Sequence, residues 1–233
     1  MNRIYAKRSL KYKLYQAVEW LQQSSHTTAF TGAGISVESG IPPFRGEHGL
    51  WSKIDPIVLD IQYFHQHPIE SWRIIIDLFY EYFARAQPND AHVALARLEN
   101  AKLLNTIVTQ NIDDLHQQAG SQHVIEFHGT SRYLVCTHCG RRFEMDETFF
   151  NQLPPLCRKC SGVLKPDFVF FGEPIPEPAN ILAFEEAEIA DVFLVIGTTG
   201  EIYPASLVPG DARDNQAKII EINPEPSKYT DSI

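Results

Sequence analysis

The sequence predicts an α/β fold in which helices cover both faces of a parallel sheet. Short runs rich in β-branched and aromatic residues alternate with helical patterns along most of the chain. Each such run ends in glycine or polar residues, as expected where parallel strands present their carboxyl ends to a ligand. With 233 residues and 44% apolar content, the chain can bury the core of one large domain.

Four of the expected strands are followed directly by a polar or glycine-containing cluster. They span residues 27–30 before TGAG, 104–108 before TQNID, 192–196 before GTTG and 218–222 before NPEP. Helical patterns occur at residues 69–85, 91–98 and 178–187. Because the carboxyl ends of parallel strands lie on one edge of a sheet, we expect the four clusters to converge on one crevice.

The overall charge and the absence of long apolar runs limit the classes of function. A net charge of -9 argues against tracking of nucleic-acid phosphates and fits a basic polypeptide partner better. No apolar run approaches the roughly 20 residues that span a bilayer, and no secretory signal segment is present. We expect a cytoplasmic protein that contacts neither nucleic acid nor membrane, and we favour a monomer.

The four cysteines form two close pairs, Cys136-x-x-Cys139 and Cys157-x-x-Cys160, with 17 residues between the pairs. In a chain without secretion features this spacing predicts a metal site of the zinc-ribbon type. Four thiolates fill every position of a tetrahedral Zn²⁺, so the metal is expected to be structural rather than catalytic. His138 could replace a cysteine, but an outward-facing side chain is favoured. Residues 132–164 are therefore expected to form a small zinc lobe.

The glycine-rich segment after the first strand indicates a nucleotide site. Gly32, Ala33 and Gly34 would let backbone N–H groups approach a diphosphate without interference from a Cβ atom. Val37 stands where a standard dinucleotide fingerprint has its third glycine, and no ribose-binding acid follows roughly 20 residues later. A hydride-transferring dehydrogenase is therefore disfavoured.

Two further clusters carry side chains suited to catalysis. His128 directly follows the strand-like residues 124–127, which places an imidazole at the sheet edge, where it can act as a general base. The segment 110–113 is expected to begin a helix that is capped by Asn111 or Asp113 and ended by Gly120. Side chains of this segment that are not needed for capping could bind the ribose and the carboxamide of a nucleotide.

A series of motifs along nearly the whole chain resembles the sirtuin family. They are TGAGIS (31–36), SGIPPFRG (39–46), TQNIDDLHQQAG (109–120), EFHGT (126–130), the paired cysteines, KPDFVFFGE (165–173), GTTGEIYPAS (197–206) and INPEP (222–226). The resemblance implies a Rossmann-like dinucleotide-binding part at about 1–40, 86–131 and 165–233. A helical insert at about 41–85 is expected to cover the crevice.

The resemblance also implies roles for individual residues. His128 looks like the general base, assisted by Asn111 and Asp113, and Val169, Phe170 and Tyr80 look like substrate contacts. The expected NAD contacts are Gly32, Ala33, Gly34, Phe44, Arg45, Gln110, Asn111, Ile112, Asp113, Gly197, Thr198, Thr199, Asn223, Pro224 and Glu225.

Two features bear on the acyl group. Phe168, Phe170 and Phe171 fit an apolar acyl tunnel and an ordinary core equally well. Members of the family that remove succinyl groups carry a Tyr-x-x-Arg pair in the cover helix, whereas Tyr80 is followed here by Phe83. Tyr82 and Arg85 also form a Tyr-x-x-Arg pair, but in a register shifted by two residues. The sequence thus favours acetyl or longer apolar acyl groups without excluding acidic ones. Pro43 stands where many members of the family carry Asp.

The expected activity is NAD-dependent removal of acyl groups from protein lysines. NAD would be consumed as a co-substrate, one structural Zn²⁺ would be held per chain, and the partners would be acyl-lysine proteins. ADP-ribosyl transfer to protein or NAD hydrolysis is the alternative within enzymes, because both break the same bond. A binding module that senses NAD without turnover is the alternative outside them.

Overall fold

A parallel five-stranded sheet forms the centre of the molecule in the computed structural model, which describes residues 9–44, 49–52 and 54–230. Its strands follow the order β3-β2-β1-β7-β8. Their bounds are β1 Thr27–Thr31, β2 Thr106–Thr109, β3 Val124–Glu126, β7 Val192–Ile196 and β8 Lys218–Ile222. The predicted strands are confirmed, with shifts of one or two residues at β1, β2 and β3.

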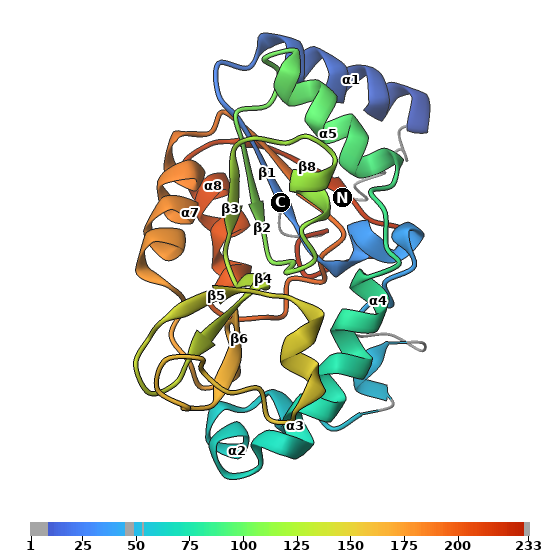
Figure 1. Cartoon of the computed structure of the whole chain (residues 1–233). Coiled ribbons are helices and arrows are strands. Elements are labelled where there is room, and N and C mark those ends of the chain that lie inside the picture. Colours follow the sequence, from blue (N-terminus) through green and yellow to red (C-terminus); the bar gives the residue numbers. More distant parts are fainter. Residues whose placement is uncertain (1–8, 45–48, 53, 231–233) are drawn as a thin grey trace, which may run out of the picture.

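Helices cover both faces of this sheet, as predicted. On one side lie α1 (Leu10–Gln23) and α5 (Asp90–Asn100), and on the other lie α7 (Glu177–Ile189) and α8 (Val208–Asp214) (Figure 1). Neighbouring strand residues point to opposite faces. Ala29 accordingly packs in the cluster of α1 and α5, whereas Phe30 packs against alanines of α7 and α8.

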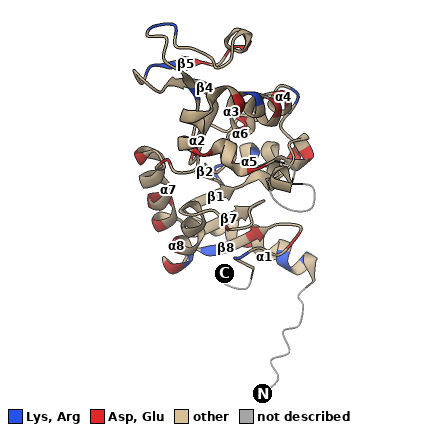
Figure 2. Ribbon diagram, turned by 90° about the horizontal axis from the view of Figure 1, so that it is seen from below, with Lys and Arg blue, Asp and Glu red and all other residues tan. Residues whose placement is uncertain are grey.

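Helix α7 is rich in acidic residues. Its sequence contains Glu177, Glu185, Glu186 and Glu188 without any Lys or Arg, and Figure 2 shows these acidic residues along the helix. Ala183 and Ala187 lie on its buried face, where small side chains let the helix approach the sheet closely. None of the helices in the described part of the chain is long and apolar enough to cross a membrane.

A second, antiparallel sheet forms a lobe beside the first. Its order is β5-β4-β6, with β4 at Gly129–Cys136, β5 at Arg142–Glu144 and β6 at Leu164–Phe168. The lobe therefore leaves the main sheet directly after His128 and returns at Val169. The backbone N–H of Val169 donates to the carbonyl of His128 at 2.8 Å, so the two ends of the lobe are fixed to each other.

The predicted helical insert packs against this lobe. It contains α2 (Ile61–Gln66), α3 (Pro68–Ile75), a π-helical stretch (Ile76–Tyr80) and α4 (Glu81–Phe83). Trp72 is fully buried, and its indole N–H donates to the carbonyl of Leu164 at 2.8 Å. This hydrogen bond joins the insert to β6.

The helix expected to begin at residues 110–113 begins later. It is α6 (Leu115–Gln118), preceded by Asp114 in the left-handed region at φ 65°. The Asp113 carboxylate accepts from the Leu115 N–H at 3.1 Å, so Asp113 does bond the first turn as expected. Asn111 does not cap the helix, because its amide is used elsewhere in the site. Gly120, at φ 103°, follows the end of the helix as predicted.

Candidate active site and metal centre

The loop after β1 lies directly against the loop after β7. The Gly32 N–H donates to the carbonyl of Ile196 at 3.0 Å, and the Gly34 N–H donates to that of Gly197 at 2.8 Å. A Cβ atom on Gly34 would lie 2.7 Å from the Gly197 Cα, closer than real Cβ contacts allow. These two glycines therefore permit close contact between the loops, and their amides are donors within the protein.

A hydrogen-bonded triad lies beneath this loop. The Asn111 amide donates to the carbonyl of Gly32 at 3.2 Å and to the Ser36 hydroxyl at 3.1 Å. The Ser36 hydroxyl in turn donates to Asp113 at 2.7 Å. Burial raises the pKa of Asp113, and hydrogen bonds from Ser36 and the Leu115 N–H oppose that rise. Ser36 belongs to the TGAGIS segment but was not among the predicted site residues.

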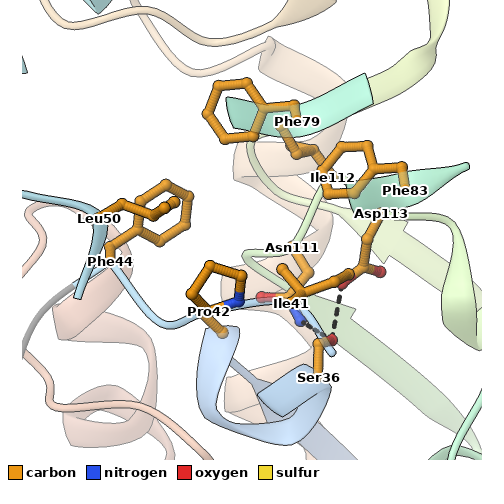
Figure 3. Close-up of a pocket in the computed structure, with 11 residues that line it drawn as sticks. Ser36, Ile41, Pro42, Phe44, Leu50, Phe79, Phe83, Asn111, Ile112 and Asp113 are labelled. Carbon is orange, nitrogen blue, oxygen red and sulfur yellow. Dashed lines mark hydrogen bonds between the residues drawn. The ribbon is translucent and has the colours of Figure 1, made fainter. Parts of the chain in front are cut away.

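A narrow pocket with about 20 Å³ of space for water-sized groups opens above the triad. Figure 3 shows Ser36, Asn111 and Asp113 at one end and aromatic side chains at the other. That volume is far below that of ordinary ligand sites and close to that of a single water molecule, so the pocket is nearly closed in this structure. Its lining residues are Ala33, Ser36, Ile41, Pro42, Phe44, Leu50, Phe79, Phe83, Asn111, Ile112 and Asp113.

His128 has the tautomer that a general base requires. Its Nδ1 lies 3.1 Å from the carbonyl oxygen of Gln110. A carbonyl can only accept, so Nδ1 carries the proton in the neutral ring and Nε2 keeps its lone pair. Burial lowers the pKa of His128, and the hydrogen bond to Gln110 opposes that shift. The imidazole is therefore held neutral and ready to accept a proton near neutral pH.

The ends of three strands meet beside this histidine, as the sequence predicts. The Gln110 amide after β2 donates to the Thr198 hydroxyl after β7 at 3.1 Å. The Asn223 amide after β8 donates to the carbonyl of Thr198 at 3.1 Å. Thr199 accepts from the Lys228 N–H through its carbonyl, while Pro224 and Glu225 are exposed. Arg45 lies outside the described residues.

The expected substrate contacts lie in different environments. Val169 is half-buried beside His128, whereas the Phe170 ring is buried at 1% exposure against Phe64 and Phe168. Phe168 and Phe170 therefore belong to the core, and Phe171 is 44% exposed.

Tyr80 does not line the pocket that contains Asn111. Its hydroxyl donates to the carbonyl of Ser131 at 3.3 Å, and its ring lies 5.1 Å from that of Phe150. From the same helical segment, Phe79 and Phe83 line the pocket instead. Neither of them was predicted as a site residue.

The four cysteines gather at the far end of the lobe. Their Sγ atoms all lie within 4.8 Å of one another, with Cys136 and Cys160 at 3.5 Å and Cys139 and Cys157 at 3.8 Å. Although burial opposes the shift, backbone N–H groups of Lys159 and Cys160 lower the pKa of Cys157 to about 6. Four thiolates at this spacing suit a tetrahedral Zn²⁺ with no open position. His138 is exposed, as expected for a residue that is not a ligand.

Comparison with known proteins agrees with this architecture. Residues 32–204 match the model of the Sir2 family. The chain is 45% identical over 222 residues to NAD-dependent protein deacetylase 1 of Pyrobaculum aerophilum, covering 93% of this chain and 86% of that protein. It is 44% identical to an NAD-dependent protein deacylase of Aeropyrum pernix, covering 93% and 88%.

Solved Sir2 structures superpose closely on this fold. A Sir2 complex with a deacetylated p53 peptide and 3′-O-acetyl ADP-ribose matches with a TM-score of 0.89 and 35% identity, covering 94% of this chain and 89% of that one. A Sir2 complex with a p53 peptide and NAD⁺ matches with a TM-score of 0.86 and the same identity and coverage. The sequence match, the shared fold and the four-cysteine lobe together show that this chain belongs to the Sir2 family.

Proposed function

We propose that this protein removes acyl groups from lysine side chains of other proteins and consumes one NAD for each group removed. The observation that carries this proposal is the arrangement around the pocket. A neutral imidazole with its lone pair on Nε2 is hydrogen-bonded to the carbonyl of Gln110, and the next residue, Asn111, belongs to the polar triad that lines a small pocket. The related deacetylases and deacylases, and the Sir2 complexes with peptide and with NAD⁺ or acetyl ADP-ribose, support it.

The reaction can be followed bond by bond. The acyl oxygen of the substrate attacks the ribose carbon that bears nicotinamide, and the bond to nicotinamide breaks. His128 then accepts the proton of a ribose hydroxyl through Nε2, and the oxygen of that hydroxyl attacks the imidate carbon. Water then adds to the same carbon, the bond from this carbon to the lysine nitrogen breaks, and the nitrogen takes up a proton. The products are free lysine, nicotinamide and O-acyl-ADP-ribose.

The polar triad is suited to holding the departing group. In our proposal, Asn111 and Asp113 bind the carboxamide of nicotinamide, and Ser36 fixes their side chains relative to each other. Because both groups are already oriented in the folded protein, they need little reorganisation when the bond breaks. Phe44, at the apolar end of the pocket, would exclude water from the charged intermediate.

The pocket lining also bears on the acyl group. Its apolar end consists of aromatic and aliphatic side chains, and none of the described residues that line it is Lys or Arg. A buried carboxylate would lack a cationic partner there, which is costly. Arg85 is exposed and lines a wider groove that shares Phe83 and Asp113 with this pocket, but it does not line the pocket itself. We therefore infer a preference for acetyl and apolar acyl groups over succinyl groups.

The acyl-lysine segment is proposed to bind along Val169, next to His128. The main-chain contact between these two residues keeps the segment and the general base together. The thiolate cluster fits a reducing compartment, and we propose that the protein acts in the cytoplasm.

Mass spectrometry of a mixed acetyl-, succinyl- and long-chain acyl-lysine peptide set tests this function. With NAD, the wild-type protein is expected to form O-acyl-ADP-ribose, and His128→Ala is expected to form none. His65→Ala changes an exposed histidine on α2 and should retain full activity. Free ADP-ribose or ADP-ribosylated peptide without O-acyl-ADP-ribose would contradict deacylation. It would show that the protein breaks the bond to nicotinamide for NAD hydrolysis or ADP-ribosyl transfer.

A further inference from the structure

Two histidines outside the proposed catalytic machinery are buried against each other. His92 of α5 is 0% exposed and His116 of α6 is 1% exposed. Their ring centroids lie 4.9 Å apart, at an interplanar angle of 61°. Burial lowers the pKa of both rings, to about 4 for His92 and about 3 for His116, so both are neutral at neutral pH.

The neighbours of each ring fix its tautomer. The backbone N–H of Asn89 donates to Nδ1 of His92 at 3.3 Å, so the proton of this ring is on Nε2. Nε2 of His116 lies 2.9 Å from the Thr31 hydroxyl oxygen. With the Thr31 hydroxyl donating to the Thr109 hydroxyl at 2.8 Å, Thr31 accepts from His116. His116 therefore also carries its proton on Nε2.

This assignment leaves one donor and one acceptor in the same buried space. The Nε2–H of His92 and the bare Nδ1 of His116 are both buried, and neither has a hydrogen-bond partner among the described residues. A buried donor or acceptor without a partner is costly. An N–H···N bond of ordinary length joins imidazole rings whose centroids lie about 5 Å apart, close to the observed separation. The two groups thus complement each other in role, and their rings lie close together, although the structure records no hydrogen bond between them.

Both ends of this pair lead to the proposed nucleotide site. On one side, the Asn89 amide donates to the carbonyl of Ile35 at 2.7 Å and to the Ser39 hydroxyl at 3.0 Å, both in the turn after β1. On the other side, the Thr109 hydroxyl accepts the backbone N–H of Asn111 at 3.0 Å. The histidine pair therefore lies between two chains of hydrogen bonds, one leading to the glycine-containing loop and the other to Asn111.

We propose that His92 and His116, joined as Nε2–H tautomers directly or through one buried water, form a one-way hydrogen-bond relay that positions the loop after β1 relative to Asn111. Protons point along it from Asn89 through His92, His116 and Thr31 to Thr109. The two histidines are positioning residues, since neither lines the pocket. The expected effect on the affinity for NAD rests on the function proposed above, whereas the existence of the hydrogen-bond relay does not.

Nitrogen NMR of protein labelled with ¹⁵N-histidine tests the relay without any turnover. Long-range ¹H–¹⁵N spectra should show two neutral histidines with the Nε2–H pattern and slowly exchanging ring protons, assigned by their loss in His92→Gln and His116→Gln. A proton on Nδ1 of either ring, or a charged imidazolium at neutral pH, would overturn the proposal.

A pair of isosteric variants tests the positioning role. Thr31→Val removes one hydroxyl from the relay, while Thr28→Val removes a buried hydroxyl of the same strand that bonds Glu186 instead. We expect the Kd for NAD, measured by calorimetry, to rise about fivefold for Thr31→Val, the effect of one lost hydrogen bond, and to stay unchanged for Thr28→Val. Equal Kd values in both variants would refute the positioning role.

A second pair of variants separates the relay from simple packing. His116→Gln keeps an N–H near the position of Nε2 and should preserve more NAD affinity than His116→Leu, which keeps only volume. Equal losses in the two variants would contradict the relay. If the wild-type protein bound no NAD, the proposed function would fail, but the tautomers seen by NMR would still decide whether the relay exists.

Discussion

Lys165 offers the sharpest test of what holds the proposed substrate segment in place. The side chain is 7% exposed, and its ammonium group lies 2.9 Å from the Glu173 carboxylate. It also donates to the carbonyls of Pro166 at 3.0 Å and Phe168 at 2.6 Å, and it lies 4.3 Å from the centroid of the Phe170 ring. Glu173 in turn accepts from the Phe170 N–H at 2.8 Å. One lysine thus fixes both ends of the segment that follows β6.

Replacement of Lys165 by methionine keeps most of the volume and removes all four interactions of the ammonium group. Removal of one partner of a buried ion pair costs about 3–5 kcal/mol. Glu173 is 25% exposed, so water recovers part of the loss, and we expect the free energy of unfolding to fall by about 3 kcal/mol. For a domain of this size that lowers the midpoint of thermal unfolding by about 6–12 °C.

Thermal and urea unfolding of purified variants measure this loss. Lys218→Met changes an exposed strand lysine and should alter stability by less than about 0.5 kcal/mol. Lys165→Met combined with Glu173→Gln should recover part of the stability, because no unpaired carboxylate remains. A loss below about 1 kcal/mol for Lys165→Met would show that water replaces the ammonium group and that the reasoning from burial is wrong.

Three further outcomes follow from the structure. Cys157→Ser is expected to reduce bound zinc from one ion per chain to nearly none, measured by elemental analysis of the purified protein, and an unchanged zinc content would exclude this cluster as the site. Gly34→Ala places a Cβ 2.7 Å from the Gly197 Cα and should cost about 1–3 kcal/mol in urea unfolding, so an unchanged midpoint would contradict the close contact between the two loops. Because His92 and His116 have pKa values below the value near 6.5 of the unfolded chain, their contribution to stability is complete above pH 6.5. It falls as pH drops towards 4, by about 2.7 kcal/mol per pH unit for the pair. The free energy of unfolding, measured as a function of pH, should fall more steeply by that slope in the wild type than in the double variant His92→Gln/His116→Gln. Parallel curves would show that the histidine pair does not cause the pH dependence.

The strand ends and the metal site were predictable from sequence because each rests on a local pattern. The β-branched run at 192–196 ends before GTTG, and strand β7 has the same bounds. Two Cys-x-x-Cys pairs at ribbon spacing require no knowledge of the rest of the chain to indicate zinc, and the four Sγ atoms do converge. The meeting of Gln110, Thr198 and Asn223 followed from the rule that parallel strands share an edge.

The parts that sequence could not supply depend on tertiary contacts. The sequence analysis explained Gly34 by the approach of its N–H to a diphosphate. In the structure this N–H donates to the carbonyl of Gly197, and only the packing of the two loops reveals this hydrogen bond. Asp114, at φ 65°, delays the start of α6. A single left-handed residue leaves no periodic signal in the sequence, so this delay could not be predicted. The side-chain partner of His116 is Thr31 of β1, which lies 85 residues away in sequence, so the burial of His116 was not visible in the local pattern.

The π-helical stretch at Ile76–Tyr80 has a consequence for how this pocket can diversify among descendants of the gene. One residue of an α-helix turns the chain by about 100°, and a π-helical turn absorbs one extra residue. Phe79 and Phe83 therefore face the pocket here, while Tyr80 faces the lobe. Deletion of a single codon in this stretch would rotate the residues before the deletion by about 100° relative to those after it. A different set of aromatic side chains would then face the ligand. Acyl preference could thus change in one genetic step, with the sheet, the zinc lobe and His128 left as they are.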